Sequence, residues 1–247
     1  HKTDPSTLSR IITNARSMKD ARIGLPKATL DADQPLAGHM VALIFEKPST
    51  RTRVSFEVGM NQLGGNAIFM HAEHSQLGRG ETVADTAKLL SRYVDLIMIR
   101  CGAHETILEL VKHAGVPVIN GLTDYNHPCQ VLADIMTFIE HKGEIKGKKV
   151  AWVGDGNNMT TSWVKAAVVM GFTLHIATPR ELSPNAEVLA WAKESGHVRW
   201  FASLYWSWYF SGRCTMGIFC RVIIYCYWCR FFKAKYINNG RWFVFKR

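Results

Sequence analysis

A chain of 247 residues is long enough to bury a sizeable core and to form one large domain or two ordinary ones. Its 30 Lys or Arg against 20 Asp or Glu give a formal net charge of +10, which by itself would suit nucleic acid or an anionic membrane surface as partner. The chain has no run of about 18 or more uncharged apolar residues and does not open on a basic-then-apolar segment. Neither a membrane-spanning helix nor a signal peptide is therefore predicted.

The excess charge is concentrated in residues 200–247. This segment carries eight Lys or Arg and no Asp or Glu, together with 17 of the 27 aromatic residues and four of the six cysteines. The rest of the chain, which we call the body, has 22 basic and 20 acidic residues. Its two cysteines, Cys101 and Cys129, fit a reducing compartment without a disulfide framework. The body is therefore predicted to be cytoplasmic.

The first elements of the body are a helix over residues 5–22 and a buried strand over residues 40–45. A helix takes over by Phe56, and the turn between reads Ser49, Thr50, Arg51, Thr52, Arg53. A helix start of this kind combines unbonded amides, the positive end of the helix dipole, hydroxyls and guanidinium groups. It suits a small, doubly charged anion such as phosphate. The alternative is a capped helix with two surface arginines.

The remainder of the body alternates strands with helices. Strands are expected at 66–70, 94–99 and 116–120, helices at 82–93, 105–114 and 130–141, and an exposed, mobile loop at 71–80. After a polar run at 141–149 come a strand at 150–153, a helix at 158–170, a strand at 172–177 and a helix at 187–194. This pattern predicts an α/β fold with two parallel-sheet domains. We assign the domains to residues 1–141 and 148–198, the second incomplete, with 199–247 as an aberrant tail.

Four strand ends in the first domain carry polar side chains, and parallel sheets bind ligands at the carboxyl ends of their strands. The four are the turn at 49–53, the loop with His71, His74, Gln76 and Arg79, the strand-end residue Arg100, and the run His127-Pro128-Cys129-Gln130. Guanidinium forks bind phosphate, and neutral imidazole can donate to a carbonyl oxygen. The combined set suits a phosphorylated carbonyl compound. Taken singly, each has a structural alternative: an exposed loop, a solvated arginine or a helix cap.

Three other kinds of site, for a metal ion, for serine hydrolysis and for a dinucleotide, fit the sequence less well. A metal site at His71 and His74 lacks a further ligand at a finger-like spacing, and a serine hydrolase lacks the G-x-S-x-G motif. Residues 154–158 follow a strand and open a helix as a dinucleotide fingerprint does, but Met159 stands where the third glycine belongs. No acidic residue ends the next strand, so NAD binding is not predicted. The amides of Asn157 and Asn158 suit a small zwitterion instead.

Three segments resemble the aspartate/ornithine carbamoyltransferase family, and within it the ornithine branch. They are F-E-K-P-S-T-R-T-R-V-S-F-E at 45–57, H-P-C-Q-V-L-A-D at 127–134 and G-D-G-N-N-M at 154–159. The resemblance covers about residues 1–198. Cys129 and the pair Asn157-Asn158 indicate the ornithine branch, because aspartate carbamoyltransferases usually show H-P-T-Q and a lysine in the loop that here reads Q-L-G-R-G at 76–80.

The resemblance implies an enzyme that transfers the carbamoyl group of carbamoyl phosphate to the δ-amine of L-ornithine, giving L-citrulline and phosphate in arginine biosynthesis. The implied carbamoyl phosphate ligands are Ser49, Thr50, Arg51, Thr52, Gln76 (from a neighbouring subunit of a homotrimer), Arg100, His127 and Gln130. Asn158 would contact the α-carboxylate side of ornithine. Arg100, His127 and Thr52 would stabilise the oxyanion of the tetrahedral intermediate. No metal, cofactor, nucleic acid or membrane is implied.

The family's D-x-x-x-S-M-G and H-C-L-P segments, which complete the ornithine pocket, do not occur in the chain. We interpret residues 199–247 as the product of a reading-frame shift or a damaged gene, which sequencing the coding DNA would test. We expect little or no turnover, and the alternative function is an inactive relic that binds carbamoyl phosphate only. Other interpretations of the tail are zinc binding at Cys214, Cys220, Cys226 and Cys229, a membrane-surface segment at 217–232, and binding of single-stranded nucleic acid.

Overall fold

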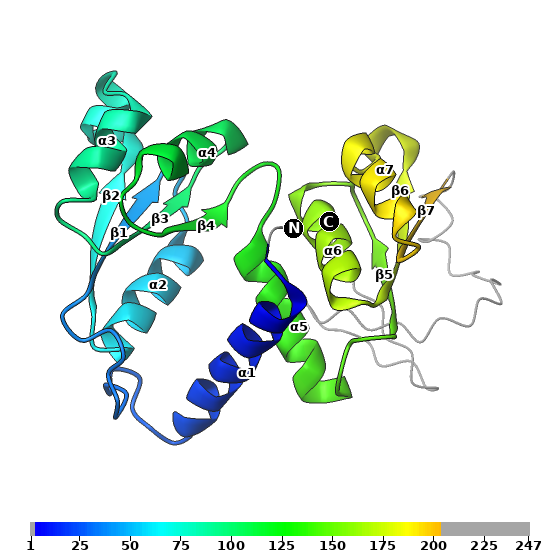
Figure 1. Ribbon diagram of the computed structural model, residues 1–247, viewed down its shortest axis with the longest axis horizontal. Helices are drawn as coiled ribbons and strands as arrows, with labels where there is room; N and C mark the ends of the chain where they lie inside the picture. The colour runs from blue at the N-terminus through cyan, green and yellow to red at the C-terminus, as the bar shows by residue number, and fades with distance from the viewer. Residues whose placement is uncertain (1–2, 204–247) are drawn as a thin grey trace. The chain divides into compact units, whose positions relative to one another are not determined.

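The computed structural model describes residues 3–203, which form two compact units with a parallel sheet in each (Figure 1). One unit contains residues 17–129, and the other contains the described residues before 17 and after 129. All strand pairs in both sheets are parallel. The predicted α/β class with two parallel-sheet domains is confirmed. The domain limits 1–141 and 148–198 stay a prediction, since the compact units divide within the helices α1 and α5.

The first sheet has the strand order β2-β1-β3-β4. Its strands are β1 Met40–Phe45, β2 Asn66–His71, β3 Leu96–Arg100 and β4 Val118–Leu122, and its helices are α2 Thr50–Gln62, α3 Val83–Leu90 and α4 His104–His113. The chain runs from β1 to β2 at one edge and then crosses to β3 on the other side of β1. The carboxyl ends of β1 and β3 therefore form the topological switch point of this sheet, where open parallel sheets bind ligands.

Helices cover both faces of the first sheet (Figure 1). The β1 residues Ala42 and Ile44 pack in one core cluster with side chains of α3 and α4. Val41, Leu43 and Phe45 pack in a second cluster with Met60 of α2. All of these β1 side chains are buried, which is why the strand reads as a continuous apolar run. Burying each large one contributes about 1.5–3 kcal/mol, so this core holds the switch point rigid.

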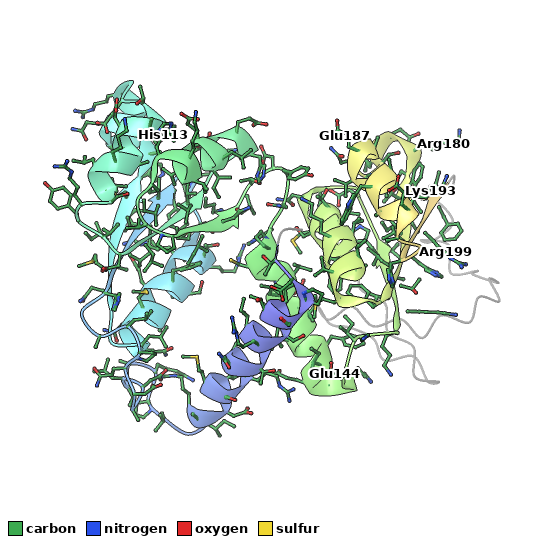
Figure 2. All side chains as sticks on the ribbon, viewed as in Figure 1. His113, Glu144, Arg180, Glu187, Lys193 and Arg199 are labelled. Carbon is green, nitrogen blue, oxygen red and sulfur yellow. The ribbon has the colours of Figure 1, made fainter. Side chains whose placement is uncertain are left out.

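The second sheet has the order β5-β6-β7. Its strands are β5 Lys149–Val153, β6 Thr173–Pro179 and β7 Val198–Ser203, and the helices of this part are α1 Pro5–Ala21, α5 Pro128–Lys142, α6 Asn158–Met170 and α7 Ala186–Glu194. Helix α7 shows why these helices start where they do. Its N-cap Asn185 accepts a bond from the Val188 amide, while Glu187 in the first turn and Lys193 in the last complement the helix dipole (Figure 2).

The structure differs from the sequence-based expectation in three segments. Residues 71–80, expected as an irregular loop, contain the 3-10 helices η1 Ala72–His74 and η2 Gln76–Arg79, and a third, η3 Arg180–Leu182, lies in the second unit. Strand β4 starts at Val118 and continues to Leu122, two residues beyond the predicted strand end at 120. Strand β7 includes residues 199–203, which composition had placed in the tail. Aromatic residues are good strand formers, so an aromatic-rich start does not end the sheet.

The interpretations of the tail as a zinc, membrane-surface or nucleic-acid site concern residues that lie outside the described part of the chain. Between residues 3 and 203, none of the helices combines the length and the apolar character needed to cross a bilayer.

Candidate anion and carbonyl site

The N-terminus of α2 is open. Its first helical hydrogen bond runs from the Arg53 amide to the Ser49 carbonyl oxygen at 3.1 Å, so the amides of residues 50–52 precede the helical ladder. Ser49 stands at the N-cap, yet its side chain accepts no amide bond. Its hydroxyl donates instead to Thr52 Oγ1 at 3.0 Å. The helix start therefore presents amides, a hydroxyl pair and the positive dipole end to an anion.

The two arginines of this turn have different surroundings. The Arg53 guanidinium lies over the Phe69 ring at 3.7 Å from its centroid, and Nε donates to Glu57 at 2.9 Å. Its charge is therefore engaged on the surface of the first sheet. Arg51 is exposed and lies close enough to Arg100 for its charge to act on that side chain. The family resemblance implies a ligand role for Arg51 and does not extend it to Arg53, and the structure shows that the two side chains have different surroundings.

Arg100 ends β3 at the switch point. Its Nη1 donates to Thr52 Oγ1 at 3.4 Å, which connects the strand end to the start of α2. Burial, and then the charge of Arg51, lower the pKa of Arg100. Among the residues that the structure describes, no carboxylate forms an ion pair with Arg100. Two positive side chains close to a helix N-terminus create a positive potential that favours a bound anion.

His127 comes from the segment between β4 and α5 and lies half-buried in the same unit. Burial, and then the positive charge of Arg100, lower the pKa of His127 to about 4. The imidazole is therefore neutral at pH 7 and can donate a hydrogen bond without adding charge. The structure thus brings Ser49, Arg51, Thr52, Arg100 and His127 to one edge of the first sheet.

Gln130 lies in the first turns of α5 and is assigned to the other compact unit. Its Nε2 donates to Asp134 Oδ1 at 2.9 Å. Asp134 is only 3% exposed, and burial raises its pKa to about 7 while the Gln130 bond acts in the opposite direction. Asp134 is not among the site residues predicted from the sequence, although an acid four residues after Gln130 in an apolar helix is a usable signal.

The loop after β2 contains the remaining predicted groups of the first domain. Gln76 is exposed at the start of η2 and is available to another chain, so its role in a shared site stays a prediction. The His71 and His74 rings lie 5.2 Å apart. Between residues 3 and 203 no three His, Cys, Asp or Glu side chains gather in a way that could hold a metal ion.

The glycine-containing turn of the second sheet is built differently. The Asn157 Oδ1 accepts bonds from the Met159 amide at 2.9 Å and the Thr160 amide at 3.4 Å, and its Nδ2 donates to Asp155 at 2.9 Å. Asn157 is therefore a helix cap, and of the two predicted asparagines only Asn158, half-buried as the first residue of α6, keeps its predicted ligand role.

Close packing of the chain's own backbone accounts for the glycine at position 156. A Cβ there would lie 2.2 Å from the Pro184 nitrogen, and the Gly156 amide donates to Leu182 at 2.7 Å. The chain's own backbone thus makes the close approach that pyrophosphate makes in dinucleotide-binding turns.

Two family models match the chain. The carbamoyl-P binding domain of aspartate/ornithine carbamoyltransferase matches residues 1–140, and the Asp/Orn binding domain of the same family matches residues 146–207. The second match includes β7 and extends beyond residue 198.

The curated relatives and solved structures compared below all bear the name ornithine carbamoyltransferase. The chain is 57% identical over 196 residues to an ornithine carbamoyltransferase of Cereibacter sphaeroides and to one of Paracoccus denitrificans, covering 79% of this chain and 64% of each relative. It resembles the structure of ornithine carbamoyltransferase from Pyrococcus furiosus, with 47% identity and a TM-score of 0.74, over 81% of this chain and 64% of that one. The Burkholderia thailandensis structure of the same name gives 43% and 0.73, over 81% and 67%. The chain thus spans 64% of the length of these curated relatives.

Proposed function

The chain belongs to the aspartate/ornithine carbamoyltransferase family, and we propose that it is an ornithine carbamoyltransferase, which moves the carbamoyl group of carbamoyl phosphate to the δ-amine of L-ornithine. One observation carries the proposal. The open N-terminus of α2, the strand-end Arg100 and the neutral His127 meet at one sheet edge. They supply phosphate recognition and carbonyl polarisation together. The relatives named ornithine carbamoyltransferase support the choice of acceptor.

The phosphate end of the ligand is assigned to the start of α2. Amides of residues 50–52, the hydroxyls of Ser49, Thr50 and Thr52, and the Arg51 guanidinium together match a dianion with several acceptor oxygens. Arg100 is bonded to Thr52, so its guanidinium extends the same positive surface toward the rest of the ligand. Gln76 is assigned to the phosphate of a neighbouring subunit, in keeping with its exposure.

The carbamoyl end is assigned to Arg100, His127 and Gln130. Attack by the neutral δ-amine of ornithine forms a C–N bond and moves the carbonyl electron pair onto oxygen. Collapse of this intermediate restores the carbonyl and breaks the C–O bond to phosphate, and the departing phosphate takes up the proton that the amine loses. Arg100, neutral His127 and the Thr52 hydroxyl stabilise the oxyanion, and each such donor is commonly worth about 3 kcal/mol in the transition state. Asp134 holds the Gln130 amide by its 2.9 Å bond, which leaves the Gln130 carbonyl oxygen for the ligand's amide group.

The remaining parts of the proposal follow from the family. The ornithine α-carboxylate side is assigned to Asn158, the two domains to residues 1–141 and 148–198, and the assembly to a homotrimer with shared sites. The protein would serve arginine biosynthesis in the cytoplasm without a metal or cofactor.

Titration calorimetry with carbamoyl phosphate tests the binding half of this proposal on the 247-residue chain, and saturable binding at one site per chain is expected. An absence of binding would contradict it. A colorimetric assay for citrulline, with L-aspartate in place of L-ornithine as control, tests the acceptor. Carbamoyl transfer to aspartate and none to ornithine would overturn the ornithine assignment.

A further inference from the structure

A single residue after β1, Glu46, makes hydrogen bonds to both ends of the segment from Arg100 to Gly102. The Glu46 amide donates to the Arg100 carbonyl oxygen at 3.0 Å. The Gly102 amide donates to Glu46 Oε2 at 2.7 Å. The three residues 100–102 are therefore held from the β1 side by the main chain and the side chain of one half-buried glutamate. The second bond is charge-assisted and belongs to the stronger class of protein hydrogen bonds.

The β4 side of the same turn is irregular. Ile99 pairs with Asn120 but Arg100 pairs with Leu122, so Gly121 is the extra residue of a bulge. A Cβ at Gly121 would lie 2.4 Å from Met98 Sδ and 3.1 Å from the Ile99 carbonyl oxygen, so the bulge packs closely against β3. A bulge redirects the side chains beside it and loosens the ladder locally. Arg100 thus leaves the regular sheet at the point where Glu46 holds it.

The Glu46 carboxylate also lies away from the guanidinium that it helps to place. Within residues 3–203 Arg100 forms no ion pair, while the carboxylate is taken up by the Gly102 amide. A Cβ at Gly102 would lie 3.3 Å from Asp124 Oδ2 and 3.8 Å from Glu46 Oε2, which shows how closely the two acids approach this turn. Burial and then these two charges raise the pKa of the adjacent Cys101 to about 12. The negative charge therefore borders the turn backbone, and the Arg100 charge stays available for a ligand.

We propose that Glu46 is a positioning residue for Arg100: it fixes the turn at residues 100–102 so that the guanidinium stays bonded to Thr52 and beside the anion site. The role rests on the proposed function, because it matters through carbamoyl phosphate. Glu46 itself touches no reacting atom in this account. The positioning role requires that the side chain at position 46 has an acceptor oxygen and is long enough to reach the Gly102 amide.

A double-mutant cycle measured by titration calorimetry with carbamoyl phosphate tests the proposal. Glu46→Ala and Glu46→Asp, which lack the acceptor or the reach, are expected to weaken binding about tenfold, the scale of one hydrogen bond to a charged group. Glu46→Gln keeps an acceptor oxygen at the same length and should stay within about threefold of the parent chain. In an Arg100→Ala background, Glu46→Ala should cause no further loss, because Glu46 acts through that arginine. Glu105→Ala, an exposed acid in the first turn of α4, is the control.

Equal loss in the parent and Arg100→Ala backgrounds, or no rescue by Glu46→Gln, would overturn the positioning role. A second readout needs no ligand. In 15N-labelled chain the Gly102 amide should resonate downfield and exchange slowly, and Glu46→Asp should move its resonance upfield and speed its exchange. An unchanged Gly102 amide overturns the proposal even if the parent chain binds no carbamoyl phosphate, a result that would count against the proposed function alone.

Discussion

The two sheets each place a helix directly after a strand, but the two helix starts are used in opposite ways. At α6 the Asn157 side chain accepts two helix amides and Gly156 packs against the chain's own backbone, so the turn is closed. At α2 the Ser49 side chain accepts none, and Arg51, Arg100 and His127 surround the start. A cap that uses its acceptor stabilises the fold, whereas a cap that leaves it unused marks a place for an anion. Breaking each start should therefore change different properties.

The largest effect on stability is expected from adding a methyl group at Gly156. In Gly156→Ala the new methyl would lie 2.2 Å from the Pro184 nitrogen, which forces backbone apart and should lower the free energy of unfolding by about 3 kcal/mol. Gly59→Ala is the matched control, because its methyl meets nothing within 4 Å and lies inside α2. Helix propensity predicts a gain of about 0.5–1 kcal/mol there. Urea denaturation measures both, and equal stabilities of the two variants would refute the packing argument.

Truncating the two N-cap side chains, Asn157 and Ser49, is expected to have effects of intermediate size. Asn157→Ala should cost about 1 kcal/mol of unfolding free energy and leave carbamoyl phosphate binding unchanged. Ser49→Ala should change stability by less than about 0.5 kcal/mol, since its side chain caps no amide, but weaken binding about tenfold. Urea denaturation gives the unfolding free energy of each variant, and titration calorimetry gives its affinity for carbamoyl phosphate. The same pattern of losses in both variants would show that the two helix starts do not differ in use.

The smallest effect near neutral pH concerns the protonation of His127. Its pKa is lowered to about 4 by burial and Arg100, below the unfolded value of 6.5. The folded state therefore binds fewer protons than the unfolded state between these values, and the stability from neutral His127 is complete above pH 6.5 and falls as the pH drops toward 4. Between about pH 6 and 8 the imidazole of the folded chain should stay neutral, so its ability to donate a hydrogen bond to the ligand should not change. An NMR titration of the His127 ring should give a midpoint near 4; a midpoint near the ordinary histidine value would contradict the neutral donor.

The regular elements could be predicted because their signals are local. The strand Met40–Phe45 and the helix Asn158–Met170 follow from apolar run and helical spacing, and the structure gives the same limits. The strand ends also place Arg100 and His127 in the unit that holds the α2 turn, which parallel topology makes foreseeable.

What sequence could not supply depends on contacts between distant segments. Apart from the family resemblance, the sequence of the turn does not distinguish Arg51 from Arg53, whose guanidinium contacts Phe69 and Glu57 in the structure. From the sequence Asn157 is a candidate ligand, but in the structure its side-chain oxygen accepts hydrogen bonds from two helix amides. The bulge at Gly121 packs against Met98 of the neighbouring strand, a contact that no local sequence pattern shows.

The most direct test of the open helix start uses the two arginines of α2 as a matched pair. Titration calorimetry should show that Arg51→Ala loses carbamoyl phosphate binding by about a hundredfold or more, the scale of a charge-assisted phosphate contact. Arg53→Ala should bind like the parent chain, because its guanidinium is held over Phe69 and bonded to Glu57. Robust binding by Arg51→Ala, or equal loss in the two variants, would contradict the assignment of the α2 N-terminus as the phosphate site.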